Sequence, residues 1–377
     1  MRFNDDKKKP IEHYAQPITN NSWQNTNMSS SENEKRGQLS KENELSVIDS
    51  ILVTGSSLFI VGSVFWVPLL FIKIYKKWKQ TPKEDKRRAY YRILFLSLLA
   101  VCVIGPHRKP WVGKMLNFRK WRLWKAWLNF VSFQVISEHI QDSAFDLKND
   151  QAILAMSPHG IVPFALGLGF IPQEALDKFG PFRPVVASAT RFFPFVRTLI
   201  GWGDGVDASR SNVHRALADG SRIGLAPGGI SEMFEGYPKK GRQPNDECVL
   251  LASRKGFIRM ALEHGVPVIP IYCFGSSKML KRLNLPILER ISNLFRISIC
   301  LFFGNNFLPV PFRKKLLYVI GRAIHPPEHL NSKKVDASVI DDILVDDMHK
   351  RFCDEMVRIF DKYKHDYGWG MKTLRIV

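Results

Sequence analysis

The sequence predicts an α/β fold, a mixed sheet flanked by helices, with an N-terminal membrane anchor segment. After about residue 130, short apolar runs alternate with stretches of helical periodicity, which is typical of α/β layers. Earlier in the chain, residues 51–72 carry no charge, which predicts a membrane-crossing helix. With 377 residues, the chain is long enough for one large domain or two small ones.

The composition indicates a folded, basic protein. Lys and Arg number 55 against 35 Asp and Glu, and 45% of the residues are hydrophobic, which is too many for a disordered basic chain. The five cysteines form no Cys-x-x-Cys pair and no Cys/His cluster with zinc spacing. We therefore expect neither a disulfide framework nor a structural metal site.

Residues 1–50 have the composition of a disordered tail. They contain seven basic and eight acidic residues, many Asn, Ser and Gln residues, and no apolar periodicity. Asn20 and Asn27 lie in acceptor patterns for N-glycosylation. Modification at these sites would report whether the tail lies in the lumen.

Residues 51–105 form the predicted membrane region, with a basic loop inside it. The stretch 51–72 is long enough to cross about 30 Å of hydrocarbon as a helix. The second apolar run, residues 93–105, is short for a span and is expected to re-enter the membrane or to lie flat. Residues 73–92 hold nine Lys or Arg and two acids, so the positive-inside rule places this loop in the cytosol. One span and two spans both fit this pattern.

Residues 106–129 form a basic, aromatic segment that we expect at the membrane interface. Residues 106–125 include seven basic residues and no acid. Tryptophans interleave with these cations at Trp111, Trp121, Trp124 and Trp127. This mixture favours anionic lipid headgroups, and no nucleic-acid recognition motif accompanies it. The alternative is an ordinary solvated helix with a Trp core face.

Residues 130–377 are predicted to form the folded domain. Apolar runs predict five strands, near 152–156, 184–189, 222–226, 267–273 and 316–320. Capping residues and glycine stops predict crossover helices over 207–220 and 253–265. Apolar residues recur at three to four residue spacing over 341–367, which predicts a long amphipathic helix whose apolar stripe packs on the core.

One histidine follows the first of these strands directly, in the run Ser157-Pro158-His159-Gly160. The carboxyl ends of strands are where α/β sheets bind ligands. Pro158 and Gly160 favour a tight turn that would hold the imidazole rigidly. A helix beginning here would keep His159 neutral and able to accept a proton. A structural histidine in a turn is the alternative.

Two further blocks are candidates for ligand contact. Ala226-Pro227-Gly228-Gly229-Ile230-Ser231-Glu232 follows a strand, and its paired glycines can present backbone N–H groups to an oxyanion or a phosphate. Glu232 is the nearest acid that would orient His159. Ser253-Arg254-Lys255-Gly256-Phe257 places two cations in the first turn of a helix, where the dipole disfavours them unless an anion binds. A plain glycine turn and a solvated basic face are the alternatives.

Taken together and in this order, these blocks resemble the type-2 diacylglycerol acyltransferase family, which also contains monoacylglycerol and wax-alcohol acyltransferases. Ser157 to Gly160 is similar to the family's His-Pro-His-Gly block, and Pro227-Gly228-Gly229 with Glu232 to its Gly-Gly-x-x-Glu block. Residues 254–275 look like its longest shared stretch, and residues 318–322 like its late strand and glycine turn. The resemblance covers roughly residues 90 to 370.

The resemblance implies a glycerolipid-acyltransferase-like sheet, with residues 130–377 as the acyltransferase domain. The implied reaction is acyl transfer from acyl-coenzyme A, a substrate and not a cofactor, to the hydroxyl of diacylglycerol or another neutral lipid. The implied location is the endoplasmic reticulum membrane, with the active site facing the cytosol, and lipid droplets as a second location. No metal is needed, because a thioester is already activated. Both termini are cytosolic in descriptions of the family, which differs from the lumenal tail that the charge pattern predicts.

The resemblance also implies site residues. His159 would be the general base, with Glu232 as its catalytic partner. The expected substrate and acyl-coenzyme A contacts are Ser157, Pro158, Gly160, Pro227, Gly228, Gly229, Arg254, Lys255, Gly256 and Phe257. Arg254 and Lys255 are expected to hold the coenzyme A phosphates. The rival functions are a wax-ester or monoacylglycerol acyltransferase and, in another class, a non-catalytic membrane protein that binds neutral lipid.

Two departures from known acyltransferase patterns stand out. Ser157 occupies the position of the first histidine in the family's block. His214 and Asp219 have the His-x4-Asp spacing of glycerolipid acyltransferases, but both fall inside a predicted helix, where five residues turn through about 140°. Their side chains would point apart, so a phosphorylated acceptor is not expected.

Overall fold

The structure is a computed structural model that describes residues 43–103, 116–138, 145–192, 194–295, 300–328 and 340–377. Most of the predicted tail, with Asn20 and Asn27, lies outside the described residues. Residues Leu39–Val377 form one compact unit. The boundaries expected near residues 51, 106 and 130 all fall within this unit.

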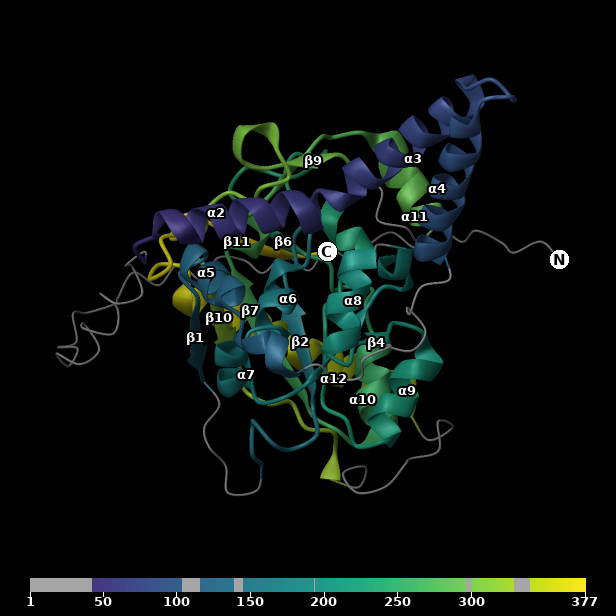
Figure 1. The fold of residues 1–377 in the computed structure, drawn as a ribbon. Helices are drawn as coiled ribbons and strands as arrows, with labels where there is room; N and C mark the ends of the chain where they lie inside the picture. The colour runs from purple at the N-terminus through teal and green to yellow at the C-terminus, as the bar shows by residue number, and fades with distance from the viewer. Residues whose placement is uncertain (1–42, 104–115, 139–144, 193, 296–299, 329–339) are drawn as a thin grey trace. The chain divides into compact units, whose positions relative to one another are not determined.

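A seven-stranded sheet forms the centre of this unit (Figure 1). Its strand order is β1-β10-β7-β2-β5-β3-β4, and only the pairing of β10 with β7 is antiparallel, so the predicted mixed sheet is confirmed. The strands are β1 (Gln134–Ser137), β2 (Ile153–Ser157), β3 (Arg183–Val186), β4 (Val206–Asp207), β5 (Ile223–Leu225), β7 (Val268–Phe274) and β10 (Leu317–Ile320). Five of these correspond to the predicted strands, and the edge strands β1 and β4 were not predicted.

Helices cover both faces of the sheet, because the central strands are apolar on both sides. On one face, Leu154 and Met156 pack with helices α5 (Arg122–Phe130), α6 (Phe164–Phe170) and α7 (Gln173–Phe179). On the other face, Ile153 and Ala155 pack with α9 (Arg210–Ala218), α10 (Gly256–His264) and α12 (Asp342–Tyr363). The helices α9, α10 and α12 match the three predicted helices.

The long helix α12 confirms that the predicted apolar stripe is core packing. Met348, Phe352, Met356 and Phe360 are all fully buried against the sheet. Asp341 caps the helix, because its side chain accepts a hydrogen bond from the Leu344 N–H at 2.7 Å. Beyond α12, the chain ends in β11 (Thr373–Ile376), which pairs with β6 (Asp246–Val249) in a small parallel sheet that was not predicted.

The predicted membrane-crossing helix is not one continuous helix. α2 (Val47–Ser56) runs into a π-helical turn (Ser57–Val61), and α3 (Ser63–Gln80) then departs at an angle of 55°. Among the described residues, no single helix is long and apolar enough to cross a membrane, although this bent pair passes the same length and composition test. A Cβ at Gly62 would lie 2.2 Å from the Leu58 carbonyl oxygen, so the bend depends on glycine.

Helix α2 belongs to the folded unit. Its buried Asp49 accepts hydrogen bonds from Arg122 at 2.7 Å and from the Asn129 amide at 3.1 Å, both on α5. Val53 is in the hydrophobic core. After α3, helix α4 (Lys86–Val103) packs back against it, with Phe71 and Phe95 in edge-to-face contact at 5.6 Å.

The interfacial role predicted for the tryptophans is wrong for Trp124 and Trp127. They are only 4% and 5% exposed, because α5 lies packed against both α2 and α6. The Trp124 indole donates a hydrogen bond to the Phe118 carbonyl at 2.7 Å, and the Trp127 indole donates one to the Ser56 hydroxyl at 3.0 Å. Trp121 is exposed, and Trp111 lies outside the described residues. The alternative of a Trp core face is therefore the correct one for this helix.

Candidate active site

His159 lies in the turn directly after β2, at the carboxyl end of the parallel strands. It is only 6% exposed. Gly160 has φ +75°, and a Cβ there would lie 2.6 Å from the Ser276 carbonyl oxygen, so the turn requires glycine. The Ser276 hydroxyl also contacts the Pro158 carbonyl. The turn that follows β7 therefore holds the His159 turn in place.

Glu232 lies in a short 3-10 helix (Ile230–Phe234) that follows β5, the strand beside β2. Its carboxylate Oε2 accepts a hydrogen bond from the His159 backbone N–H at 3.0 Å and lies 3.4 Å from His159 Nε2. The other oxygen accepts a hydrogen bond from the Leu250 N–H at 3.4 Å. The structure thus brings together the two residues that the sequence selected from separate blocks.

The two glycines before Glu232 have different structural roles. A Cβ at Gly228 would lie 2.7 Å from the Glu232 carboxyl carbon, so glycine is needed for the carboxylate to fold back over the turn. Gly229 has φ +59°, and its carbonyl oxygen lies 2.6 Å from His159 Nε2. The paired glycines therefore shape the surroundings of His159 on two sides.

The Gly229 carbonyl fixes the tautomer of His159. A carbonyl oxygen can only accept a hydrogen bond, so Nε2 carries the hydrogen and Nδ1 carries the lone pair. Nδ1 is buried and has no hydrogen-bond partner among the described residues. It is therefore the ring atom that is free to accept a proton.

Burial raises the pKa of Glu232, and this effect outweighs the opposing effects of His159, of the N–H donors of His159 and Leu250, and of the positive charge of Arg254. A carboxylate 3.4 Å from Nε2 stabilises a protonated imidazole. In known catalytic dyads and triads, an acid beside the imidazole orients the base in the same way.

The two cations before α10 interact with different neighbours. Lys255 Nζ lies 2.6 Å from the Asp346 carboxylate on α12, in an exposed ion pair. Arg254 acts electrostatically on Glu232, and its buried Nε has no hydrogen-bond partner among the described residues. Of the two cations, Arg254 is the one whose charge acts on the pKa of Glu232.

The other predicted substrate contacts differ in burial and in their place in the fold. Phe257 is 5% exposed and makes an edge-to-face contact with Phe352 at 5.0 Å, so it packs in the core, and its substrate contact stays a prediction. Gly256 is exposed at the first position of α10, and Pro227 is half-buried before the glycines. Ser157 is fully buried at the end of β2.

Ser157 pairs in register with Tyr272 of β7, a residue that the sequence analysis did not select. Both side chains are fully buried, and neither hydroxyl has a hydrogen-bond partner among the described residues. Burial raises the pKa of Tyr272 well above its ordinary value. The apolar run 267–273 predicted a strand, but only the register shows that its tyrosine lies beside the site.

As predicted, His214 and Asp219 do not form a pair. His214 lies 3.0 Å from a Glu263 carboxylate oxygen and 2.9 Å from His264 Nε2, whereas Asp219 is the residue after the end of α9. The described residues include no group of three or more His, Cys, Asp or Glu side chains able to hold a metal ion.

Comparison with known proteins gave matches over most of the chain. A family model described as "Diacylglycerol acyltransferase" matches residues 88–376. The chain is 25% identical over 286 residues to diacylglycerol O-acyltransferase 2 of Homo sapiens, covering 70% of this chain and 67% of that protein. It is 26% identical over 335 residues to acyl-CoA wax alcohol acyltransferase 2 of Homo sapiens, covering 83% and 90%.

Two further matches are another relative found by sequence and a solved structure. The chain is 23% identical over 283 residues to 2-acylglycerol O-acyltransferase 1 of Bos taurus, covering 70% of this chain and 77% of that protein. A solved structure of the 1-acyl-sn-glycerophosphate acyltransferase PlsC from Thermotoga maritima is similar with a TM-score of 0.39 and 16% identity, covering 84% of this chain and 97% of that one. The names of the three curated relatives state three acceptors: diacylglycerol, a wax alcohol and a 2-acylglycerol.

Proposed function

The chain belongs to the diacylglycerol acyltransferase family and is an acyltransferase, and we propose that it transfers an acyl group from acyl-coenzyme A to the hydroxyl of diacylglycerol, making triacylglycerol. One observation carries this proposal beyond the family assignment. His159 is held by Gly229 and Glu232 in the tautomer that leaves Nδ1 able to accept a proton. Acyl-coenzyme A is then a substrate, and the reaction requires no cofactor.

In the proposed mechanism, His159 Nδ1 removes the proton of the acceptor hydroxyl while the hydroxyl oxygen attacks the thioester carbonyl. Glu232 stabilises the resulting imidazolium across the 3.4 Å to Nε2. The tetrahedral intermediate then expels the coenzyme A thiolate, which takes the proton back from His159. General base catalysis of this kind typically contributes about 10²- to 10⁴-fold.

The oxyanion of that intermediate needs hydrogen-bond donors, each commonly worth about 3–4 kcal/mol. The candidates from the sequence are the backbone N–H groups around Gly228 and Gly229, or those near Gly160. The Gly229 N–H already donates to the Ala226 carbonyl at 3.1 Å, so it is not available. The N–H groups of Gly228 and Gly160 have no acceptor among the described residues, and we assign the oxyanion to them.

Arg254 and Lys255 remain the proposed contacts of the coenzyme A phosphates. The exposed pair between Lys255 and Asp346 contributes about 0–1 kcal/mol, so a phosphate can replace Asp346 as the partner. Burial raises the pKa of Glu232 and the positive charge of Arg254 opposes this rise, so Arg254 is the cation that we assign to the phosphate nearest the site. The first turn of α10 adds backbone N–H groups.

The proposed location is the endoplasmic reticulum membrane, with the site facing the cytosol. The bent pair of α2 and α3 supports attachment to a membrane, because it is apolar and is followed by a basic loop. A wax alcohol is the second candidate acceptor, because the wax alcohol acyltransferase match covers more of both chains than the diacylglycerol acyltransferase match does.

The test is an acceptor panel. The chain is expressed in cells that lack neutral-lipid synthesis, and membranes are assayed with labelled oleoyl-coenzyme A and diacylglycerol, monoacylglycerol or fatty alcohol, beside His159→Ala. We expect triacylglycerol only from the unsubstituted chain. A different preferred acceptor would change the substrate and keep the mechanism. No product from any acceptor, at matched expression, would favour the non-catalytic lipid-binding rival.

A further inference from the structure

Large apolar side chains are exposed in two separate stretches of the described chain. Fifteen of them lie between residues 47 and 101, in the N-terminal helices. Seven more lie between residues 283 and 308, and only four occur anywhere else in the described residues. The second stretch contains Leu294, which is 76% exposed, and Phe307, which is 84% exposed. Such clustering marks an interaction surface.

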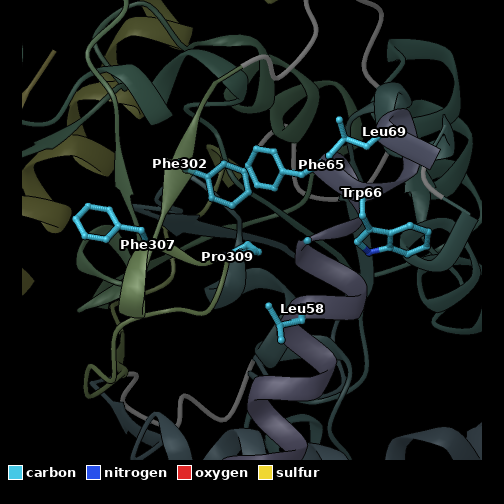
Figure 2. Close-up of a pocket in the computed structure, with 8 residues that line it drawn as sticks. Leu58, Phe65, Trp66, Leu69, Phe302, Phe307 and Pro309 are labelled. Carbon is cyan, nitrogen blue, oxygen red and sulfur yellow. The ribbon is translucent and has the colours of Figure 1, made fainter. Parts of the chain in front are cut away.

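The two stretches meet in space although more than 200 residues separate them. Phe65 of α3 and Phe302 of β9 (Phe302–Phe303) have ring centroids 5.0 Å apart. The Pro309 ring packs so close to Gly62 that a Cβ there would lie 3.2 Å from it. Figure 2 shows the groove between them, with Leu58 and Trp66 on the helix side and Phe307 on the other. The groove has a volume of about 450 Å³ and is lined by aliphatic and aromatic side chains and Gly62.

Helix α11 (Pro286–Phe295) extends the second stretch. Ile287 and Leu294, seven residues apart and hence on one face of the helix, are 67% and 76% exposed. Arg290, three residues after Ile287 and four before Leu294, is exposed on the same face, so this face of α11 presents apolar side chains together with a cation.

The charge around this surface is positive. Residues 281–315 include seven Lys or Arg and one acid, and α3 includes four Lys and no acid. That one acid, Glu289, lies 3.1 Å from Lys239 Nζ. Lys281, Arg290 and Lys314 are exposed. Cations beside exposed apolar groups suit a bilayer with anionic headgroups, and they would repel the same surface of a second copy.

We infer that residues 283–295 and 300–309 form a second membrane-inserting element, which acts with α2 and α3 to hold the protein on the bilayer, with phospholipid acyl chains in the groove between them. This inference rests on the proposed function, because an enzyme with a neutral lipid acceptor takes its substrate from the bilayer. The chain then contacts the membrane at two sites that are distant in sequence. Phe307 and Leu308 are the residues of the second element that insert.

The test uses the full chain bound to vesicles that contain anionic phospholipid and a phosphatidylcholine with a photoreactive diazirine in its acyl chain. After illumination, mass spectrometry identifies the labelled residues. We expect label on residues 301–309 and on α3, and none on Met371, which is exposed to the same 84% as Phe307 but belongs to the turn before β11, outside both apolar stretches. Label confined to residues 47–101 would overturn the inference. Cross-links from this surface to a second protein copy would also overturn it.

A pair of variants measures the contribution of the second element. Phe307→Asp with Leu308→Asp should weaken vesicle binding about tenfold or more, because two inserting side chains become charged. Met371→Asp, the matched control, should bind as the unsubstituted chain does. Equal binding by all three proteins would contradict a second inserting element. Circular dichroism and thermal melting of each variant check that it is folded.

Activity separates this inference from the proposed function. With diacylglycerol in vesicles, the double variant should lose activity in proportion to its lost binding. With diacylglycerol dispersed in detergent, it should retain the activity of the unsubstituted chain. If the unsubstituted chain makes no product in either form but the lipid label still falls on residues 301–309, the proposed function fails and the second inserting element stands.

Discussion

The His159 site and the apolar surface around Phe307 differ most in how far their side chains are exposed to solvent. His159 and Glu232 are 6% and 5% exposed, and neighbouring backbone groups hold both in place. Phe307 and Leu294 are 84% and 76% exposed. Proton transfer from a weakly acidic hydroxyl needs a fixed geometry and little water. Collection of a lipid substrate needs apolar side chains that the fold itself leaves uncovered. Under the two proposals, chemistry and substrate capture would be divided between the carboxyl edge of the sheet and the helices that carry the exposed apolar side chains.

The two regions also use glycine differently. Gly160 and Gly228 leave room for the backbone and for the carboxylate that position His159. Gly62 leaves room for Pro309 and allows the bend that separates α2 from α3. In the site, glycine permits close approach of polar groups. At the surface, it permits close approach of two apolar segments.

The largest expected effect tests whether the chemistry depends on His159 alone. His159→Ala should lower kcat by about 10²-fold or more, because it removes the imidazole that the proposed mechanism uses as the general base. Vesicle binding should not change, since the apolar surface is untouched. The exposed His365 provides the control His365→Ala, which should retain full activity. Equal product from His159→Ala and the unsubstituted chain would remove His159 as the base.

The next effect tests the fixed geometry. Gly228→Ala should reduce kcat about tenfold or more, because the added methyl group would displace the Glu232 carboxylate that lies within 2.9 Å of it. KM for acyl-coenzyme A should change less than kcat. Gly236→Ala is the matched control, because a Cβ there meets nothing within 4 Å. Loss of activity in both variants would show that glycine flexibility, and not the place of Glu232, matters.

The strands and the proximity of the two blocks that carry His159 and Glu232 could be predicted from the sequence because their signals are local. A strand buried on both faces, such as β2 or β7, is a continuous apolar run bounded by turn residues. His159 and Glu232 each follow such a run, so their place at the carboxyl edge of the sheet follows from the strands themselves.

Features that depend on a distant partner could not be predicted. Trp124 and Trp127 have basic neighbours in the sequence, as the tryptophans of an interfacial segment do. Only the packing of α2 on α5 shows that they are core residues. Asp49 gave no local sign that it would pair with Arg122. The meeting of Phe65 with Phe302 likewise depends on the whole fold.

A third region, around Glu138, should affect the stability of the fold without affecting the His159 site or the apolar surface around Phe307. Glu138, at the end of β1, contacts Arg358, Lys362 and Tyr363 on α12, with Arg358 Nη1 at 2.7 Å. Burial raises its pKa, but the hydrogen bonds from these three side chains outweigh burial and lower the pKa to about 2. Its contribution to stability is therefore present above the ordinary pKa of 4.5 and is lost as the pH falls from there towards 2.

Glu138→Gln should accordingly lower the free energy of unfolding by about 1–3 kcal/mol at pH 7 and by much less near pH 2. Denaturant titrations at several pH values measure this difference. The activity of the folded fraction and its vesicle binding should both stay within error of the unsubstituted chain. A stability loss that is the same at every pH would mean that packing, and not charge, accounts for the role of Glu138.

The smallest effect concerns the two hydroxyl groups beside the site. The Tyr272 and Ser157 hydroxyls are buried without a partner in the described part of the chain, and a buried unpaired polar group costs stability. Tyr272→Phe should therefore leave the free energy of unfolding unchanged or raise it by about 1 kcal/mol, with activity within about twofold of the unsubstituted chain. Thermal melting and the acyl transfer assay measure the two effects. A tenfold loss of activity without a loss of stability would contradict this prediction, because it would mean that the buried hydroxyl acts on the substrate, and the boundary of the chemical region would then extend from β2 to β7.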